Sequence, residues 1–319
     1  MKYEGMIFRP PSEANSLILQ VTVGCSYNRC TFCGAYREKS FRVKSFDEVK
    51  NDIDEVSSYG TRIPRVFLAD GDALILPQNE LVQILDYLKL KLNGLERIGT
   101  YANARDILKK GREELQHLKG LGLGMIYLGL ESGNPEVLQR IKKNATVDQM
   151  IRAAAKVREA GILLSVTVLL GIGGVEGSQR HAEDTGTVLS KMDPDFVGAL
   201  SLMVVPGTPV ERELETGQWA LPTPFGLIEE LQTMIAHCEF SHCFFASNHA
   251  SNYLPLKIQM PEQKSPWSYF SDRALNQIRE NMGSDGWLRM RLIVTFVCDM
   301  QKRTRWGSPI TRTIWCGLR

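Results

Sequence analysis

Short apolar runs alternate with amphipathic segments along the first two thirds of the chain. The runs are rich in β-branched residues and nearly free of internal charges, which is typical of strands buried on both faces. They occupy residues 17–23, 65–70, 98–102, 125–130, 163–170 and 196–204. Between them we expect helices, and two of these begin with capping boxes, Ser45 to Glu48 and Thr146 to Gln149. Other helices are expected from residue 79, over 105–118, from 134 and over 181–190.

This alternation of strands and helices predicts an α/β fold. No two neighbouring runs are joined as a hairpin would be, so the strands should lie parallel and be wound right-handedly. We therefore expect a βα barrel, open or closed, with its functional groups at the C-terminal ends of the strands.

The chain is expected to divide into four parts. Residues 1–16 form an N-terminal arm, 17–215 the core barrel, 216–260 a C-terminal helical or capping extension, and 261–319 an irregular, partly basic tail. The polar run 248–253 is expected to return to the mouth of the barrel, but its role is not predicted.

Composition indicates a globular intracellular protein. The chain has 319 residues, 43% hydrophobic and 23% charged, and its formal net charge of +2 argues against a general polyanion binder. Its seven cysteines occur without a recognisable secretory signal, so we expect a reducing, cytoplasmic location. No apolar stretch is long enough to predict a membrane anchor.

Three cysteines follow the first predicted strand. Cys25, Cys30 and Cys33 have CX4CX2C spacing, and no other Cys or His precedes His117. A closed zinc site needs four protein ligands, whereas three thiolates on a [4Fe–4S] cluster leave one iron open. The spacing favours an open iron–sulfur cluster over zinc completed by a remote ligand or a coincidence.

The cysteine loop, with Phe32 directly before its last cysteine, resembles the cluster loop of the radical S-adenosylmethionine (SAM) superfamily. The familiar spacing there is CX3CX2C, so this loop has one extra residue. Linked features extend the resemblance over residues 15–210: glycine and acid after the second strand, Glu-Ser-Gly after the fourth, glycines after the fifth. The chain is most similar to the elongator-type and coproporphyrinogen-dehydrogenase-type core domains. The fold expected from this is a partial (β/α)6 TIM-like barrel with a C-terminal helical extension.

The resemblance implies a cofactor set and a reaction. Cys25, Cys30 and Cys33 would bind a [4Fe–4S] cluster whose free iron binds SAM. One electron then cleaves SAM to methionine and a 5′-deoxyadenosyl radical, which abstracts hydrogen from a substrate. An electron donor such as flavodoxin or ferredoxin is implied. No side-chain acid or base is needed for the first step, so no catalytic residue is assigned.

The resemblance also implies SAM contacts at the strand ends. Gly71 and Asp72 would meet the methionine amino group, and Glu131 and Ser132 the ribose hydroxyls. An ordinary βα turn and a helix-entry acid are the alternatives at these two places.

Three further contacts follow in the same way. Arg105 would hold the SAM carboxylate, Gly171 would lie near the adenine through its backbone, and Phe32 would form a wall beside it. A solvated arginine and a core aromatic residue are the alternatives for Arg105 and Phe32. A nucleotide phosphate loop is the weak alternative at Gly171, because the loop lacks the Lys-Ser/Thr of a P-loop and follows the fifth strand rather than the first.

Other motifs favour simpler explanations. Cys238 and Cys243 lack the compact spacing of a second cluster and are expected to be buried thiols. His249, inside the polar run, is a candidate substrate contact. The basic tail with Trp306 and Trp315 is expected to be a solvated end rather than an RNA-binding segment.

The expected function is a radical SAM enzyme with oxidoreductase- or lyase-type chemistry and an unidentified substrate. A small molecule is favoured over nucleic acid. A non-catalytic iron–sulfur carrier and a tRNA- or protein-modifying radical enzyme are the alternatives.

Overall fold

The computed structural model describes residues 1–264. Predictions for Trp306, Trp315 and the basic tail fall on residues 265–319, outside the described residues. An eight-stranded sheet organises the described part, in the order β1-β4-β5-β6-β7-β8-β9-β10. Its strands are β1 (Leu17–Gln20), β4 (Arg65–Ala69), β5 (Arg97–Tyr101), β6 (Leu123–Glu131), β7 (Leu163–Leu170), β8 (Phe196–Ser201), β9 (Cys243–Ala246) and β10 (Lys257–Met260). A small antiparallel pair, β2 (Thr22–Val23) and β3 (Arg42–Val43), lies beside the main sheet.

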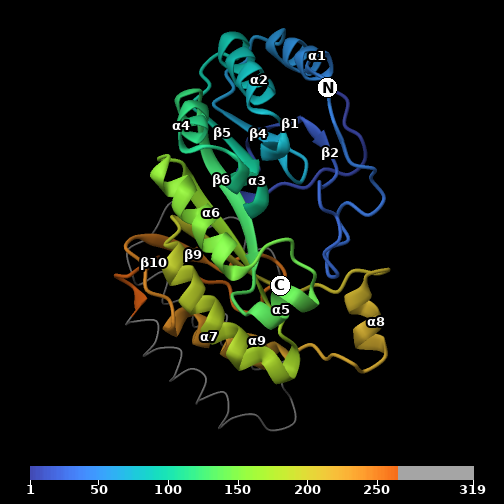
Figure 1. Cartoon of the computed structure of the whole chain (residues 1–319), viewed down its shortest axis with the longest axis vertical. Coiled ribbons are helices and arrows are strands. Elements are labelled where there is room, and N and C mark those ends of the chain that lie inside the picture. The colour runs from blue at the N-terminus through green and yellow to red at the C-terminus, as the bar shows by residue number, and fades with distance from the viewer. Residues whose placement is uncertain (265–319) are drawn as a thin grey trace, which may run out of the picture. The chain divides into compact units, whose positions relative to one another are not determined.

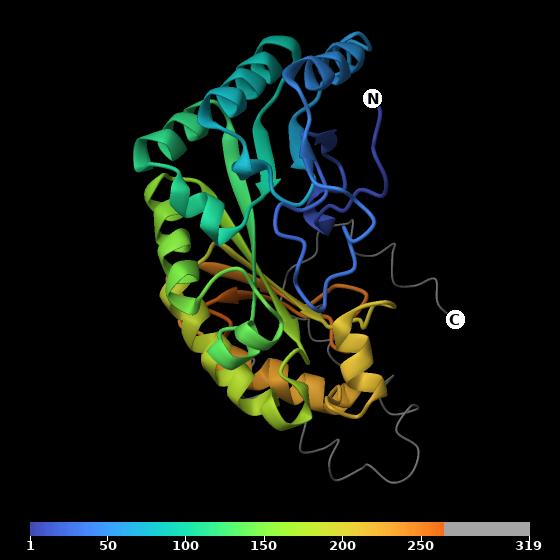
Figure 2. The same ribbon diagram turned by 45° about the vertical axis from the view of Figure 1, so that its right-hand side comes forward.

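Strands β1 to β9 of the main sheet pair in parallel, and β10 pairs antiparallel with β9. The helices of the described residues are α1 (Phe46–Ser57), α2 (Gln78–Lys91), α3 (Ala104–Lys109), α4 (Arg112–Gly120), α5 (Pro135–Arg140), α6 (Val147–Glu159), α7 (Gly174–Met192), α8 (Pro209–Glu215) and α9 (Pro224–Ala236). Most of them cover the outer face of the curved sheet, whereas α8 lies on its other side, as Figures 1 and 2 show. Two short 3-10 turns, η1 (Pro11–Glu13) and η2 (Ala73–Ile75), complete the elements.

The predicted fold class is confirmed. Within residues 1–264 the sheet stays open, with β1 and β10 at its two edges. Both predicted capping boxes are present, because Ser45 and Thr146 each accept the N–H of the third helical residue. The six predicted strands are all present, and the sheet has eight strands because β9 and β10 extend it beyond β8.

One predicted helix is two. The segment expected as a single helix over 105–118 is divided at Lys110 and Gly111 into α3 and α4. Glycine begins α4 as its N-cap, and the Glu114 carboxylate accepts the Gly111 N–H at 2.5 Å. α3 packs against α6, whereas α4 packs against α2 and β6.

The topology brings the candidate residues together at one end of the sheet, where the parallel strands terminate. Because β1, β4, β5, β6 and β7 are parallel neighbours, their C-terminal ends lie side by side. β1 leads to the cysteine loop, β4 to Gly71, β5 to Arg105 and β7 to Gly171, and Glu131 is the last residue of β6.

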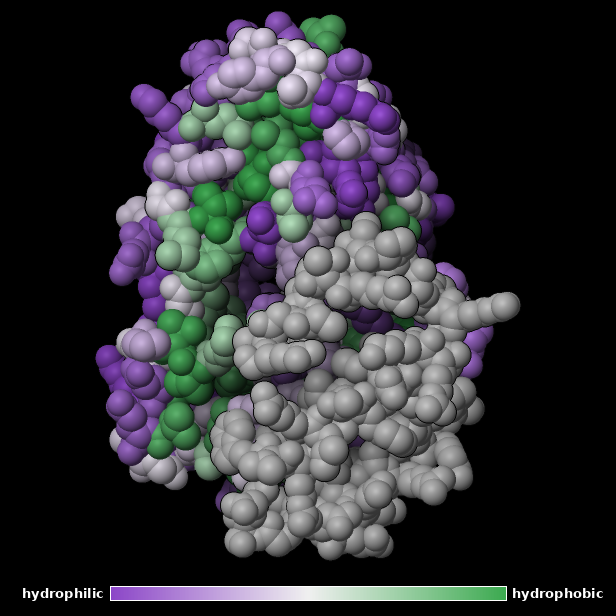
Figure 3. Space-filling model, turned by 180° about the vertical axis from the view of Figure 1, so that it is seen from behind, coloured by the Kyte–Doolittle hydropathy of each residue, from purple (hydrophilic) through white to green (hydrophobic). Residues whose placement is uncertain are grey.

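Apolar residues also reach the surface. Seen from behind, they form a strip flanked by polar residues (Figure 3). Among the described residues, exposed large apolar side chains include Met6, Leu90 and Met203, at 71%, 77% and 62% exposure. In the same part of the chain, no helix has both the length and the apolar character required to cross a bilayer.

Candidate cofactor site

The cysteine loop is fastened to the end of β4 by backbone and side-chain hydrogen bonds. Gly24, with a φ of +77°, donates its N–H to Asp70 Oδ2 at 3.1 Å and accepts the Gly71 N–H at 3.1 Å. Glycine suits this place because other residues rarely adopt a positive φ. Ser26 Oγ donates to Asp72 Oδ2 at 2.7 Å. The loop that begins at Cys25 is thereby held against the strand end predicted to bind SAM.

The second half of the loop is held from the opposite side. Thr31 donates its N–H to the Ile141 carbonyl at 3.0 Å and accepts the Val210 N–H at 3.4 Å. Arg37 Nε donates to the Cys33 carbonyl at 2.9 Å. The residues after α5 and at the start of α8 therefore fix the peptide that carries Cys30 and Cys33.

The three loop thiols share one neighbourhood. Burial raises the pKa of Cys30 to about 11 against the lowering effect of Lys143, and Cys25 and Cys33 also act on it electrostatically. Burial likewise raises the pKa of Cys33. Binding of a metal cluster must therefore displace thiol protons.

The donors fit an iron–sulfur cluster in their chemistry, because thiolates are its usual ligands. Among residues 1–264, no three Cys, His, Asp or Glu side chains already stand in metal-ligand geometry.

Gly71 leaves room that a side chain would fill. A Cβ added there would lie 3.0 Å from the Cβ of Cys25 and 2.9 Å from the ring of Tyr36. Both distances are shorter than ordinary van der Waals contact. The absence of a side chain at Gly71 lets the end of β4 approach the cysteine loop closely, as a shared cluster and SAM site would require.

Two acids flank Gly71 and are both turned into the protein. Asp70 is fully buried, and its Oδ2 accepts from Lys39 Nζ at 2.7 Å and Gln20 Nε2 at 3.1 Å. Asp72 is also buried, and its Oδ2 accepts from Asn103 Nδ2 at 2.8 Å. The two carboxylates therefore stabilise the strand end. Since the Gly71 N–H is donated to the Gly24 carbonyl, the Gly71 carbonyl is the backbone group that can accept a hydrogen bond from a ligand.

Asp72 has a second acid beside it. Burial, followed by the neighbouring carboxyl of Asp106, raises the pKa of Asp72 to about 7. A protonated Asp72 can donate to Asp106, whose buried Oδ2 otherwise lacks a partner among the described residues. Arg105 lies on an exposed part of α3, with Nε 3.9 Å from Asp106 Oδ1, and its predicted contact with the SAM carboxylate stays a prediction.

Glu131 ends β6 in an unusual backbone conformation. Its φ is +65°, a region that few residues other than glycine adopt. Its Oε1 accepts from Lys143 Nζ at 2.9 Å, and each of the two side chains is only 12% exposed. The bend thus directs the Glu131 carboxylate, with Lys143, to the end of the sheet at which the cysteine loop lies.

Lys143 was missed by the sequence analysis. Burial lowers its pKa, but the charges of Glu131 and Cys30 outweigh that effect and raise it above the ordinary value. Lys143 therefore remains a cation beside the cysteine loop. Its place after α5 carries no motif in the sequence, and only its proximity to Cys30 in the fold reveals it.

Ser132 and Gly171, predicted at the ribose and the adenine, are both hydrogen-bonded inside the protein. The Ser132 hydroxyl is fully buried, lies 2.8 Å from His181 Nδ1 and accepts the Asn134 N–H at 3.0 Å. Gly171 donates its N–H to Glu230 Oε1 at 2.6 Å. The Ser132 hydroxyl therefore supports the strand end, while Glu131 beside it carries the free acceptor capacity.

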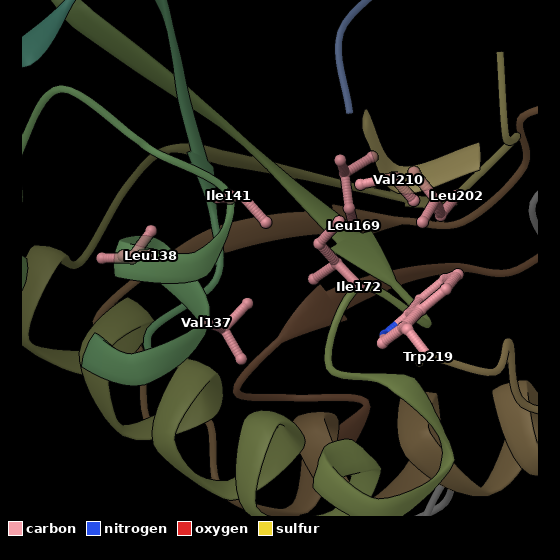
Figure 4. Packing of buried hydrophobic residues seen from close by; sticks show 8 residues of the cluster. All are labelled: Val137, Leu138, Ile141, Leu169, Ile172, Leu202, Val210 and Trp219. Atoms are coloured by element: carbon pink, nitrogen blue, oxygen red, sulfur yellow. The ribbon is translucent and has the colours of Figure 1, made fainter. Parts of the chain in front are cut away.

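Phe32 joins a hydrophobic cluster behind the cysteine loop. The partly buried ring packs against side chains from α5, β7 and the segments after β7 and β8. Figure 4 shows the cluster: Val137, Leu138, Ile141, Leu169, Ile172, Leu202, Val210 and Trp219. Phe32 is thus a packing residue, and its predicted contact with adenine stays a prediction.

The remaining candidates lie at and beyond β8. In the polar run, Asn252 Nδ2 donates to the Ala199 carbonyl at 2.7 Å, and Asn252 Oδ1 accepts from Ser201 Oγ at 2.9 Å. The run is therefore fastened to the C-terminal end of β8. Cys238 and Cys243 are both fully buried free thiols, as expected.

Comparison with known proteins adds an independent test. The sequence matches the radical SAM superfamily over residues 19–183. It is 25% identical over 201 residues to a 4′-phospho-dehydrooxetanocin synthase of Priestia megaterium, covering 56% of this chain and 27% of the synthase. It is 22% identical over 304 residues to an uncharacterized protein of Methanocaldococcus jannaschii, covering 89% and 87% of the two chains.

A solved structure shares the fold. Coproporphyrinogen III oxidase from Escherichia coli, a radical SAM enzyme, superposes with a TM-score of 0.54 at 16% identity over 69% of this chain and 51% of the oxidase. This chain spans about a quarter of the length of the Priestia synthase and about half that of the oxidase. The match to the superfamily covers more than half of this chain. The chain therefore belongs to the radical SAM superfamily, which confirms both the predicted family and its predicted cofactors, a [4Fe–4S] cluster and SAM.

Proposed function

We propose that this protein is a radical SAM enzyme that reductively cleaves SAM and uses the resulting radical to abstract hydrogen from a substrate. The observation that carries the proposal is the convergence of the cysteine loop, Gly71 and the buried Glu131–Lys143 pair at one end of the parallel sheet: Gly71 lies beside Cys25, and Lys143 and Glu131 act electrostatically on Cys30. The convergence lies inside the segment that matches the superfamily.

The cofactors supply the difficult chemistry. When bound, a [4Fe–4S] cluster would supply the one-electron reduction that cleaves SAM. Cys25, Cys30 and Cys33 would hold three of its irons. The thiolates of this loop carry negative charge once deprotonated, and the buried cation Lys143 lies where it offsets that charge.

The remaining residues of the site would bind and orient SAM. Gly71 offers a backbone without a side chain next to Cys25, which suits the amino acid part of SAM. Glu131 accepts one hydrogen bond from Lys143 and retains lone pairs for two ribose hydroxyls. Asp72 and Ser132 would act through support of these strand ends, since their own polar groups face the protein.

Radical SAM enzymes need a reductant, and we propose a flavodoxin or ferredoxin as the donor. A small-molecule substrate is supported by the modest net charge of +2 and by the relative named as a synthase. The tRNA- or protein-modifying enzyme and the non-catalytic carrier remain the alternatives.

The test is SAM cleavage by anaerobically reconstituted protein. After reduction with dithionite, 5′-deoxyadenosine is quantified by chromatography for wild type, Cys30→Ala and Cys238→Ala. Cys238→Ala is the matched control, because Cys238 is a buried thiol outside the cysteine loop. Cleavage by wild type and Cys238→Ala, with none by Cys30→Ala, is expected. A wild type that assembles the cluster but forms no nucleoside would favour the carrier.

A further inference from the structure

A chain of buried polar groups joins the ends of β6 and β7 beneath the proposed SAM site. It runs from Ser132 through His181 on α7 to Glu230 on α9 and on to Gly171. Ser132 and His181 are fully buried, and Glu230 is 2% exposed. Burying a polar side chain costs free energy unless the side chain finds a hydrogen-bond partner. The presence of this series of buried polar groups therefore has to be explained by what they hold in place.

The hydrogen bonds of His181 fix its tautomer. Nε2 faces only acceptors, the Leu169 carbonyl at 3.1 Å and Glu230 Oε1 at 3.4 Å, and so carries a proton. Nδ1 lies 2.8 Å from the Ser132 hydroxyl. Because that hydroxyl already accepts the Asn134 N–H, its own proton is free to be donated to Nδ1. One imidazole thus links Ser132, after the end of β6, to Leu169 near the end of β7.

Glu230 holds the other strand end. Its Oε1 accepts the Gly171 N–H at 2.6 Å, and its Oε2 accepts from Ser178 Oγ. Gly171 has a φ of +83°, so its peptide is already in a conformation that most residues avoid. A carboxylate acceptor gives a stronger hydrogen bond than a neutral one, which suits the fixing of such a peptide.

The same helix α7 fixes the loop after Glu131. Thr185 Oγ1 accepts the Gly133 N–H at 2.8 Å and donates to the His181 carbonyl at 2.5 Å. Asn134 Nδ2 donates to Asp184 Oδ2 at 2.6 Å. The short loop that follows Glu131 is therefore positioned from below by α7, and α7 is tied to α9 by the His181–Glu230 contact.

We propose that His181 and Glu230 are positioning residues that set the relative placement of the Glu131 and Gly171 strand ends, and thereby the affinity for the nucleoside part of SAM. This inference rests on the proposed function, because it assumes that SAM binds at these ends. Glu230 lies outside the segment 19–183 that matches the superfamily, so the SAM site of this chain would depend on a residue beyond that segment.

The first test is SAM binding by calorimetry to anaerobically reconstituted, unreduced full-length protein. Glu230→Ala is expected to weaken binding at least tenfold, whereas Glu230→Gln keeps a carbonyl acceptor for Gly171 and should stay within threefold of wild type. After reduction with dithionite, the turnover number for SAM cleavage at saturating SAM should change less than threefold in both variants. Ile235→Ala is the matched control, since Ile235 is fully buried on the same helix but outside the polar chain.

The second test needs no cofactor. In cluster-free protein, hydrogen exchange of the peptide that contains Gly171 is followed by mass spectrometry. Glu230→Ala should accelerate exchange there, and His181→Ala should do so in the peptide around Gly133. Ile235→Ala should leave the relative protection of these two peptides unchanged. Uniformly faster exchange in all three variants would mean a general loss of stability and would overturn the positioning role.

The outcomes separate the two proposals. Wild-type protein that binds its cluster but not SAM would overturn the proposed function and this inference together. Wild-type protein that binds SAM, with Glu230→Ala binding equally well, would leave the proposed function intact and overturn only the positioning role.

Discussion

Removing either member of the buried Glu131–Lys143 pair should destabilise the cluster-free protein. The atoms are 2.9 Å apart, and each side chain is 12% exposed, so water screens the pair weakly. At an effective dielectric constant of about 20 the Coulomb attraction is roughly 6 kcal/mol, and desolvation offsets much of it. Loss of one partner leaves a buried charge without compensation, which typically costs about 3–5 kcal/mol.

The double variant isolates the interaction itself. Glu131→Gln leaves Lys143 as a buried cation, and Lys143→Met leaves Glu131 as a buried anion. When both are changed, neither charge remains, so the double variant should lose clearly less stability than the sum of the single variants. We expect a coupling energy of about 2–3 kcal/mol, within the range found for contacting residues.

The assay is urea denaturation of the full-length, cluster-free chain, followed by tryptophan fluorescence under reducing conditions. The exposed pair Arg62–Glu96, with side chains 68% and 60% exposed, is the matched control. The double-mutant cycle of this exposed pair should give a coupling energy of about 0.5 kcal/mol or less, because water screens the two charges. A Glu131–Lys143 coupling as small as that of the control would refute the argument that burial makes this pair strong.

Three further predictions concern the neighbouring residues. Gly71→Ala should reduce iron content and SAM affinity at least tenfold, because its Cβ would press on Cys25, whereas Gly120→Ala, with open space around its Cβ, should leave both unchanged. Asp72, whose folded-state pKa is raised to about 7, adds stability that is complete below about pH 4 and is lost as the pH rises through 7. Thermal scans of cluster-free protein should show this loss, on the order of 4 kcal/mol, and Asp72→Asn should abolish it; an unchanged pH profile in that variant would contradict the assignment. Gly133→Ala should lower the free energy of unfolding by about 1–3 kcal/mol, because its Cβ would lie 2.5 Å from the backbone of α7; unchanged urea denaturation would contradict that packing.

Much of the fold could be predicted from the sequence because its strands are short, uncharged runs rich in apolar and β-branched residues. The run Leu163–Leu170 carries no charge and only two polar residues, Ser165 and Thr167, and this strand was predicted with the bounds that the structure has. The capping boxes at Ser45 and Thr146 likewise depend only on neighbours in sequence.

The parts that escaped prediction depend on contacts between distant residues. β9 has only four residues, Cys243–Ala246, and is a strand because it pairs with β8 rather than by its own pattern. Lys143 and Glu230 lie in segments without a motif, and their significance comes from Glu131 and Gly171, which the fold brings next to them. A single sequence contains no record of these pairings.

The cysteine loop lies between these two cases. Its spacing identified Cys25, Cys30 and Cys33 as a set, because ligands on one short loop are close whatever the fold. The sequence also suggested which strand ends face them. It could not show that the Asp72 and Ser132 side chains are taken up by internal hydrogen bonds.

The most direct test of the central claim is the electron paramagnetic resonance spectrum of the dithionite-reduced, reconstituted protein with and without SAM. We expect a [4Fe–4S] signal whose shape changes when SAM is added, because three cysteine ligands would leave one iron open to SAM. The change should be retained in Gly120→Ala, because nothing lies within 4 Å of the added Cβ. A reduced cluster whose signal is the same with and without saturating SAM would contradict the claim that these strand ends form a SAM site.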